Sequence, residues 1–340
     1  MNTHRVLALL GLLAAVESGC SGSDLSGHPM STGGAGAGGR AGTSLGSAGN
    51  AASSAAGGGA GGSVAFQSAG ASGSADSAAG ESNGGSTGTI DPMLPPPGWT
   101  LAWSDEFNGA KGDMLDQSKW SYSVGPNNAN KEQEFYTDRP ENSGMDGEGH
   151  FLITALHEDY MGYQYTSAKF TSSGNYEPKY GRLEARIKLP SGKGLWPAFW
   201  NLGTNIGDVG WPNCGEMDIM ETVGDELTTN HGSLHGPGYS GGSPLTGTFT
   251  LPNGALFSDD FHVFAAEWEE NVVRFYVDSN LYETKTPDDV PPGKTWVYDH
   301  SVFMILNVAV GGTWPGNPDN SIFPSSMAID YVRVYERTAP

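Results

Sequence analysis

The chain has 340 residues, of which 37% are hydrophobic and 16% charged, and its formal net charge is −21. Residues 91–340 hold 34 acidic and 15 basic residues, so nearly all of the negative charge lies in this part of the chain. This acidity repels nucleic acid and anionic lipid headgroups, so it excludes nucleic-acid binding and disfavours sulfated polysaccharides as substrates.

The first twenty residues have the pattern of a signal peptide. Arg5 precedes an apolar run over residues 6–16, which is too short to span a bilayer as a helix. Small residues stand directly before Cys20, and this predicts a bacterial lipoprotein site with a lipid anchor on Cys20. The alternative is ordinary cleavage nearby and secretion into the medium. Glu17 favours that alternative, because lipoprotein sites usually have an aliphatic residue there.

Residues 21–90 consist mainly of Gly, Ser and Ala. Such a segment cannot bury enough surface to offset its conformational entropy, so we expect a disordered linker. The run Pro95-Pro96-Pro97 marks the start of a domain over residues 91–340, whose length fits a single unit. Cys214 is the only cysteine outside the signal segment, so no intrachain disulfide is expected in the mature domain.

Strand signals recur at short intervals through this domain. Turn residues separate them, and Asp278-Ser279-Asn280 follows an apolar run in the manner of a hairpin. No stretch has a convincing long helical period. The pattern predicts an all-β fold of two stacked antiparallel sheets. The expected strands cover residues 151–155, 181–189, 262–268, 272–277, 302–310 and 329–335.

Three carboxylates lie within the otherwise apolar stretch of residues 216–221. Burying carboxylates is costly unless they are paired or take part in chemistry. On a regular strand Glu216 and Asp218 share one face and Glu221 points to the other. A β-bulge near Met220 would bring all three to one cleft, and bulges are frequent beside active sites. The alternative is a polar edge strand with solvated carboxylates.

Aromatic residues flank this stretch on both sides. Trp196 and Trp200 lie upstream, Trp211 lies five residues before Glu216, and residues 231–239 follow downstream. Exposed aromatic faces stack on the apolar faces of sugar rings, so these tryptophans are candidate stacking platforms of a carbohydrate cleft. The alternative for each of them is core packing. Two glutamates in such a cleft are what glycoside hydrolysis needs.

Seven segments in order resemble one known family: residues 103–107, 180–186, 195–200, 215–221, 234–238, 307–312 and 329–335. From about Trp99 to Tyr335 the chain resembles the family 16 glycoside hydrolases, in particular the bacterial laminarinase-like endo-1,3-β-glucanases. The two residues between Asp218 and Glu221 resemble the bulged branch of that family. The resemblance implies a jelly-roll β-sandwich with an open concave groove, which favours internal cleavage of long chains.

The resemblance also implies residue roles. Glu216 would be the nucleophile and Glu221 the general acid/base of a retaining mechanism. Asp218 would hydrogen-bond the nucleophile, and His235 would hydrogen-bond Glu221 or the leaving sugar. No cofactor is implied for catalysis. The partner would be a neutral β-glucan, bound by a monomer.

Several further residues resemble functional positions of the family. Asn142, Arg182 and Trp314 would line or close the groove, although an ion pair is an alternative for Arg182. Glu106 and Asp330 lie in segments that flank a structural calcium in the family, with Gly147 donating a backbone carbonyl. Oxygen ligands of this kind suit Ca²⁺, but two solvated surface acids are an equal alternative.

Other functions remain open at this stage. The same fold and mechanism could act on a galactan such as agar or carrageenan, or transfer the sugar to another sugar as a transglycosylase. A protein that binds β-glucan without cutting it is a further alternative, although such relatives usually lack the two glutamates.

Overall fold

The computed structural model describes residues 95–338. The predicted signal peptide, the linker and Cys20 lie outside the described residues. Within residues 95–338 the one α-helix is the four-residue α1 (Ile206–Val209), so the described part is nearly all β. No helix in this range has the length and apolarity to cross a membrane. Short 3-10 turns lie at Ala129–Lys131, Pro252–Gly254, Pro287–Asp289 and Asn320–Ile322.

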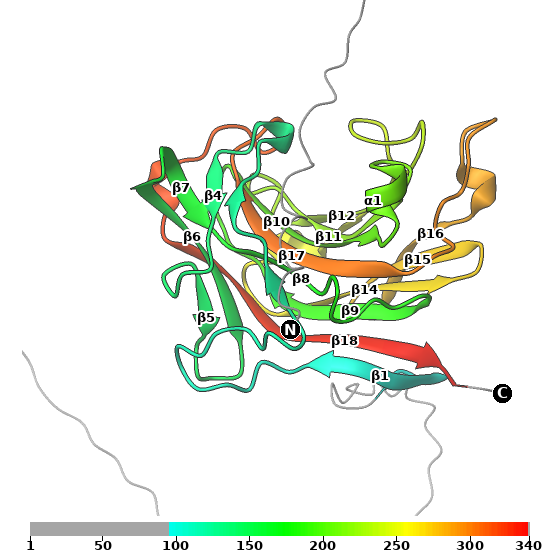
Figure 1. Ribbon diagram of the computed structural model, residues 1–340, viewed down its shortest axis with the longest axis horizontal. Helices are drawn as coiled ribbons and strands as arrows, with labels where there is room; N and C mark the ends of the chain where they lie inside the picture. The colour runs from blue at the N-terminus through cyan, green and yellow to red at the C-terminus, as the bar shows by residue number, and fades with distance from the viewer. Residues whose placement is uncertain (1–94, 339–340) are drawn as a thin grey trace, which may run out of the picture. The chain divides into compact units, whose positions relative to one another are not determined.

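Two sheets make up the domain (Figure 1). The larger has eleven strands. Its main path runs β16 (Asn280–Lys285), β15 (Val272–Val277), β14 (His262–Glu269), β9 (Gly181–Lys188), β18 (Ser325–Arg337), β6 (Phe151–Tyr160), β7 (Tyr163–Ser167), β4 (Glu134–Tyr136) and β3 (Gly125–Pro126). The strand β1 (Trp99–Asp105) pairs with β18, and β5 (Ser143–Met145) pairs with β6.

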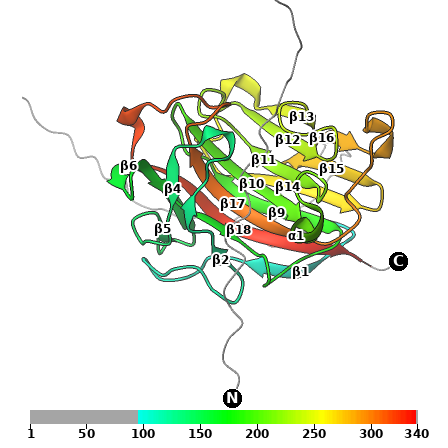
Figure 2. The same cartoon turned by 45° about the horizontal axis from the view of Figure 1, so that its top comes forward.

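The smaller sheet has seven strands and is the one that positions the carboxylates. Its order is β13 (Leu245–Thr250), β12 (Thr229–His235), β11 (Glu216–Glu221), β10 (Leu195–Gly203), β17 (Val302–Val310), β8 (Lys169–Thr171) and β2 (Ser121–Tyr122). Figure 2 shows these strands above those of the larger sheet, with β9, β14 and β18 beneath them. The pairings in this sheet are antiparallel throughout.

The hydrophobic core lies between the two sheets. Each strand contributes alternate residues to it, for example Phe199 from β10, Leu306 from β17 and Leu183 from β9, all fully buried. Residues between these positions point away from the core. The prediction of an all-β fold of two stacked sheets is confirmed, with one departure, since β4 and β7 pair in parallel.

The predicted strands are present, and the longest ones extend further than expected. The strand β6 continues to Tyr160 and β18 begins at Ser325, because the ends of these strands carry polar residues and are recognised only through their pairing. The hairpin expected after residues 272–277 is formed by β15 and β16. Strand boundaries at polar ends therefore depended on partners elsewhere in the chain.

One close backbone approach fixes the entry to β11. A Cβ atom on Gly203, the last residue of β10, would lie 2.0 Å from the carbonyl oxygen of Cys214. Gly203 also donates its N–H to the carbonyl of Gly215 at 3.2 Å. The free and buried Cys214 thus lies in a loop that is pressed against β10 directly before the first carboxylate.

Candidate active site

The strand β11 has the predicted bulge. Opposite β10, Asp218 pairs with Trp200 and Met220 pairs with Phe199, so Ile219 is the extra residue. Opposite β12 the register is also interrupted, between Asp218 and Glu221. An extra residue in one strand reverses the alternation of the side chains that follow it.

The bulge places all three carboxylates on one face. Met217, Ile219 and Met220 are fully buried in the core between the sheets. Glu216 and Asp218 therefore point away from the core, and Glu221 rejoins them because two consecutive residues, rather than one, are turned inward. The sequence-based prediction of a single face for the acids is confirmed by this register.

Glu216 lies under the exposed Trp211. The indole Nε1 of Trp211 donates a hydrogen bond of 2.8 Å to Glu216 Oε2. Trp211 is 38% exposed and lies in the loop between α1 and β11. The other oxygen of Glu216 faces His235, which is directly opposite it on β12, with 3.9 Å between Oε1 and Nε2.

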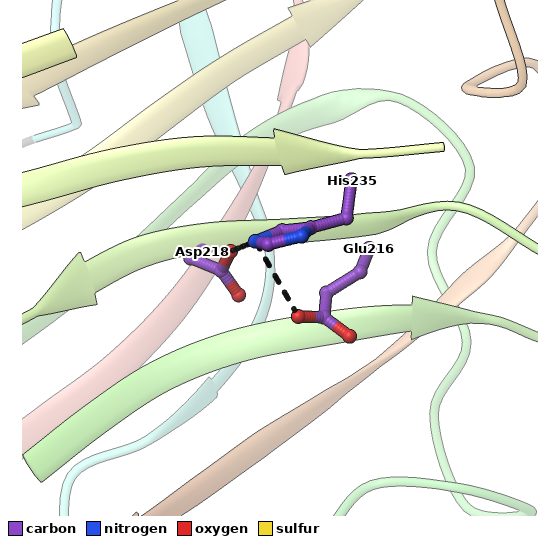
Figure 3. Close-up of side chains that lie close together, drawn as sticks. All are labelled: Glu216, Asp218 and His235. Carbon is purple, nitrogen blue, oxygen red and sulfur yellow. Dashed lines mark ion pairs between the residues drawn. The ribbon is translucent and has the colours of Figure 1, made fainter. Parts of the chain in front are cut away.

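His235 lies between Glu216 and Asp218, as Figure 3 shows. The backbone N–H of Gly241 donates to His235 Nδ1 at 3.1 Å, so Nδ1 is an acceptor and the ring proton is on Nε2. Nε2 lies 3.1 Å from Asp218 Oδ2. We expected His235 to hydrogen-bond Glu221 or the leaving sugar. The first alternative is wrong, because the register places His235 opposite Glu216, and the second stays a prediction.

Glu216, Asp218 and His235 offer ligand atoms within 4.8 Å of one another, a spacing that a metal ion also requires. Histidines that bind metals usually donate from their second ring nitrogen to a carboxylate or carbonyl group. Here the second nitrogen accepts the Gly241 N–H instead. This tautomer makes Nε2 a hydrogen-bond donor, so the cluster is better suited to orient carboxylates than to bind a cation.

Glu221 has a tryptophan partner of its own. The indole Nε1 of Trp196, on β10, donates a hydrogen bond of 2.8 Å to Glu221 Oε1. The ring of Trp196 packs edge-on against Trp314, with centroids 5.3 Å apart. Trp314 in turn packs edge-on against His231, the residue opposite Glu221 on β12. Trp314, 39% exposed, therefore lies close to Glu221, and its place at one end of the groove stays a prediction.

The environment of these acids favours their protonated forms. Burial, and next the charge of Asp218, raise the pKa of Glu216 to about 8. Burial likewise raises the pKa of Asp218 to about 8. The pKa of Glu221 lies well above its ordinary value, first because of burial and then because of the two neighbouring acids. Protons held in a cluster of this kind are available for acid catalysis near neutral pH.

Comparison with known proteins agrees with this geometry. The model of the glycosyl hydrolases family 16 matches residues 119–333. The chain belongs to family 16 of the glycosyl hydrolases. It is therefore a glycoside hydrolase, and enzymes of this family need no cofactor for catalysis.

Individual relatives of this family 16 enzyme are similar over the whole domain. A β-glucanase of Rhodothermus marinus is 39% identical over 251 residues, which cover 70% of this chain and 86% of that protein. The laminarinase catalytic domain of Thermotoga maritima is 47% identical with a TM-score of 0.66, over 71% of this chain and 99% of that one. The endo-β-1,3-glucanase of Pyrococcus furiosus is 44% identical with a TM-score of 0.66, over 71% and 96%. The fold is thus the jelly roll of the laminarinases.

The family 16 domain also has a cluster of polar and charged side chains that the sequence did not reveal. The indole Nε1 of Trp200 donates to Asn307 Oδ1 at 2.8 Å, and Lys169 Nζ lies 5.1 Å from the centre of the Trp200 ring. Lys169 interacts electrostatically with Glu132 and Glu134, whose pKa values are raised by burial. These residues come from segments far apart in sequence, so only the tertiary structure brings Lys169 close enough to interact with Glu216.

Two residues predicted to line the groove do not do so. Asn142 is completely buried, and its amide bonds to protein groups only, among them the Thr154 carbonyl at 3.1 Å and the Thr166 hydroxyl at 2.9 Å. Arg182 lies on the outer face of the larger sheet and pairs with Glu184 at 2.7 Å and Glu267 at 3.2 Å. The alternation around Arg182 could have shown this, because Leu183, Ala185 and Ile187 face the core.

The predicted calcium ligands have different surroundings. Both carboxylate oxygens of Glu106 accept hydrogen bonds from Arg333, at 3.0 and 2.7 Å, so this side chain does not fit a cation site. Asp330 lies at a bulge of β18 and pairs with Arg186 through Oδ2 only.

Proposed function

We propose that this enzyme hydrolyses β-1,3-glucan internally, with retention of configuration, and that it also accepts mixed-linkage β-1,3/1,4-glucan. The observation that carries the proposal is the bulged strand β11, which presents Glu216 and Glu221 on one face, each held by an indole N–H. The names of the relatives, laminarinase and endo-β-1,3-glucanase, support glucan as the substrate.

In the first step the Glu216 carboxylate attacks the anomeric carbon. The bond between that carbon and the glycosidic oxygen breaks, and Glu221 gives its proton to the departing oxygen. In the second step Glu221, now ionised, takes a proton from water. The water oxygen attacks the anomeric carbon, and Glu216 leaves as a carboxylate. Two inversions at one carbon give net retention.

The neighbouring residues support this division of roles. Trp211 Nε1 and His235 Nε2 point at opposite oxygens of Glu216, at 2.8 and 3.9 Å, and both favour its ionised form. Glu221 stays protonated in the free enzyme, because burial and the adjacent acids raise its pKa. Asp218 lies between the two and contributes the repulsion that keeps a proton on the acid.

The substrate class follows from charge and aromatic surface. The enzyme carries a net charge of −21, which disfavours an anionic galactan such as carrageenan. Trp211 and Trp314, each more than a third exposed, lie beside the two glutamates and offer ring surface to sugars. We expect these rings to flank an open groove in which a long neutral glucan lies.

The test is product analysis with the full chain and with Glu216→Gln in parallel, on laminarin, barley mixed-linkage glucan, agarose and κ-carrageenan. We expect short laminari-oligosaccharides from the wild type only, first formed as the β-anomer. Release of galactan fragments without glucan cleavage would contradict the substrate assignment. Tight binding to glucan without any cleavage would instead indicate a recognition protein, and transfer products at high oligosaccharide concentration a transglycosylase.

A second experiment assigns the two glutamates. Azide should rescue Glu216→Gly and give a glycosyl azide of inverted configuration, because azide replaces the missing nucleophile from the opposite side of the sugar ring. Azide rescue of Glu221→Gly should give retained configuration, because the glycosyl-enzyme still forms. The reverse pattern would exchange the roles.

The location of the enzyme and its structural cation belong to the same proposal. We expect a monomer at the cell envelope, anchored through Cys20, or secreted if that cysteine is not lipidated. Palmitate labelling that is lost in Cys20→Ala would support the anchor.

We further expect one structural Ca²⁺ at the Asp330 side chain and nearby carbonyls, including that of Gly147, rather than at the Glu106 carboxylate, which Arg333 occupies.

A further inference from the structure

We propose that Trp211 and Trp196 are positioning residues that act separately, each holding one catalytic carboxyl group through its indole N–H, so that each tryptophan controls one limb of the pH–rate profile. This inference rests on the proposed roles of Glu216 and Glu221. It gives the two tryptophans a function other than the stacking expected from the sequence.

The two contacts are alike in length but come from different parts of the fold. Trp211 reaches Glu216 Oε2 from the loop before β11, and Trp196 reaches Glu221 Oε1 from the neighbouring strand β10, both at 2.8 Å. An indole N–H only donates, so it favours the carboxylate over the carboxylic acid. Each donor touches one glutamate only, and this separates their effects.

Both indoles are held in place by their surroundings. The loop of Trp211 is closed by hydrogen bonds from Cys214 N to the Gly210 carbonyl and from Asn213 Nδ2 to the Val209 carbonyl, both at 3.0 Å. The ring of Trp196 is supported edge-on by Trp314. A donor fixed before the substrate arrives stabilises a charge without reorganisation, as preorganised catalytic dipoles do.

Other charged or titratable groups also face the two carboxyls. Asp218 and His235 act on both glutamates, and Lys169, Cys214 and Tyr298 lie close enough to interact with Glu216. His231 is opposite Glu221 on β12. Because these groups are common to wild type and variants, a difference confined to one limb reports the indole that was changed.

The sign of each effect follows from the role of each acid. Glu216 must be ionised, so it governs the acidic limb, and Glu221 must be protonated, so it governs the alkaline limb. Loss of the Trp211 N–H makes Glu216 harder to ionise and moves the acidic limb to higher pH. Loss of the Trp196 N–H makes Glu221 hold its proton longer and moves the alkaline limb to higher pH. Because the two acids titrate as a coupled pair, loss of the Trp211 N–H acts mainly on the lower apparent pKa of the pair. Loss of the Trp196 N–H acts mainly on the higher one.

The experiment measures kcat/KM against pH on laminarin for the full chain and for Trp211→Phe, Trp196→Phe and Trp200→Phe. Phenylalanine keeps an aromatic ring and removes the N–H. We expect a shift of about one pH unit in the acidic limb for W211F and in the alkaline limb for W196F, the size of one lost charge-assisted hydrogen bond. Trp200 donates to the neutral amide of Asn307, so W200F should leave both limbs in place, whatever it does to KM.

A purely structural role predicts a different result. If W211F and W196F lower kcat/KM by the same factor at every pH, or move the same limb, the proposal is wrong. Should W196F fail to fold, W211F alone decides, since its shift must be confined to the acidic limb. If the wild type cleaves no glucan, the proposed function fails. The indole effect is then still tested by ¹³C-glutamate NMR titration, in which W211F must raise the pKa of Glu216 and W196F that of Glu221.

Discussion

Replacing Glu216 by Gln should make the enzyme more stable at neutral and alkaline pH while abolishing its activity. Glutamine has nearly the same shape, and its carbonyl oxygen still accepts the Trp211 N–H. The substitution removes a buried carboxyl that lies beside Asp218, and with it the repulsion between the two acids. The repulsion between Glu216 and Asp218 is therefore measurable as a lower stability of the wild type relative to Glu216→Gln.

The magnitude follows from the change in pKa between the unfolded and folded protein. The pKa of Glu216 rises from 4.5 to about 8 on folding. At about 1.4 kcal/mol for each pKa unit, this amounts to about 5 kcal/mol at most. The Glu216 side chain is 17% exposed and shares the effect with Asp218, so we expect a gain nearer 2 kcal/mol. For a domain of this size that corresponds to about 4–8 °C in Tm.

The sign of the pH dependence is fixed by the direction of this change. The folded state holds its proton more tightly than the unfolded state, so the contribution of Glu216 is fully favourable below pH 4.5. It is lost as the pH rises through about 8. The variant does not titrate at this position. The Tm difference between Glu216→Gln and wild type should therefore be small at pH 4.5, grow up to pH 8 and stay level above it.

The assay is thermal unfolding of both proteins from pH 4 to pH 9, with the exposed Glu141→Gln as the matched control. Both Glu→Gln variants lose one charge, but only Glu216 has acidic neighbours in a buried cluster. A constant Tm difference at all pH values, or an equal response of Glu141→Gln, would refute the reasoning.

Three further predictions concern residues outside the proposed catalytic pair. Asn142→Ala should lower the free energy of unfolding by about 3 kcal/mol, because buried hydrogen-bond partners lose their amide, and leave KM on laminarin unchanged. A raised KM at unchanged stability would restore Asn142 to the groove. EDTA should lower the Tm of wild type and Glu106→Gln but not that of Asp330→Asn, in unfolding scans with and without added Ca²⁺. An unaffected wild type would exclude the cation. Burial raises the pKa of Cys214 to about 11, so iodoacetamide at pH 8 should modify it in urea but hardly in the native enzyme. Equal rates in mass spectrometry would contradict this.

The placement of the acids shows how function depends on a small irregularity. Glu221 follows Glu216 at i+5, an odd offset that on a regular strand sends the two side chains to opposite faces. The extra residue Ile219 costs one unpaired position in the sheet and brings Glu221 to the same face as Glu216. One residue fewer between the two glutamates would also place them on the same face. A motif that is one residue shorter therefore fits a regular strand without a bulge.

The sequence by itself determined the sheets, the candidate catalytic acids and the need for a bulge. Alternation is a local property, so the apolar residues of 181–189 and 302–310 identify strands without knowledge of their partners. The odd spacing of Glu216 and Glu221 made an irregularity near Met220 a requirement, and the structure has it one residue earlier, at Ile219.

Only the tertiary structure decided which groups meet these acids. The neighbours of a side chain across a sheet depend on strand order and register, which are set by contacts between residues far apart in the chain. That is why His235 faces Asp218 rather than Glu221, and why the tryptophans expected to stack on sugars also donate to Glu216 and Glu221. Lys169 and Asn307 could not be recognised for the same reason: nothing within their own strands shows that they adjoin the carboxylates.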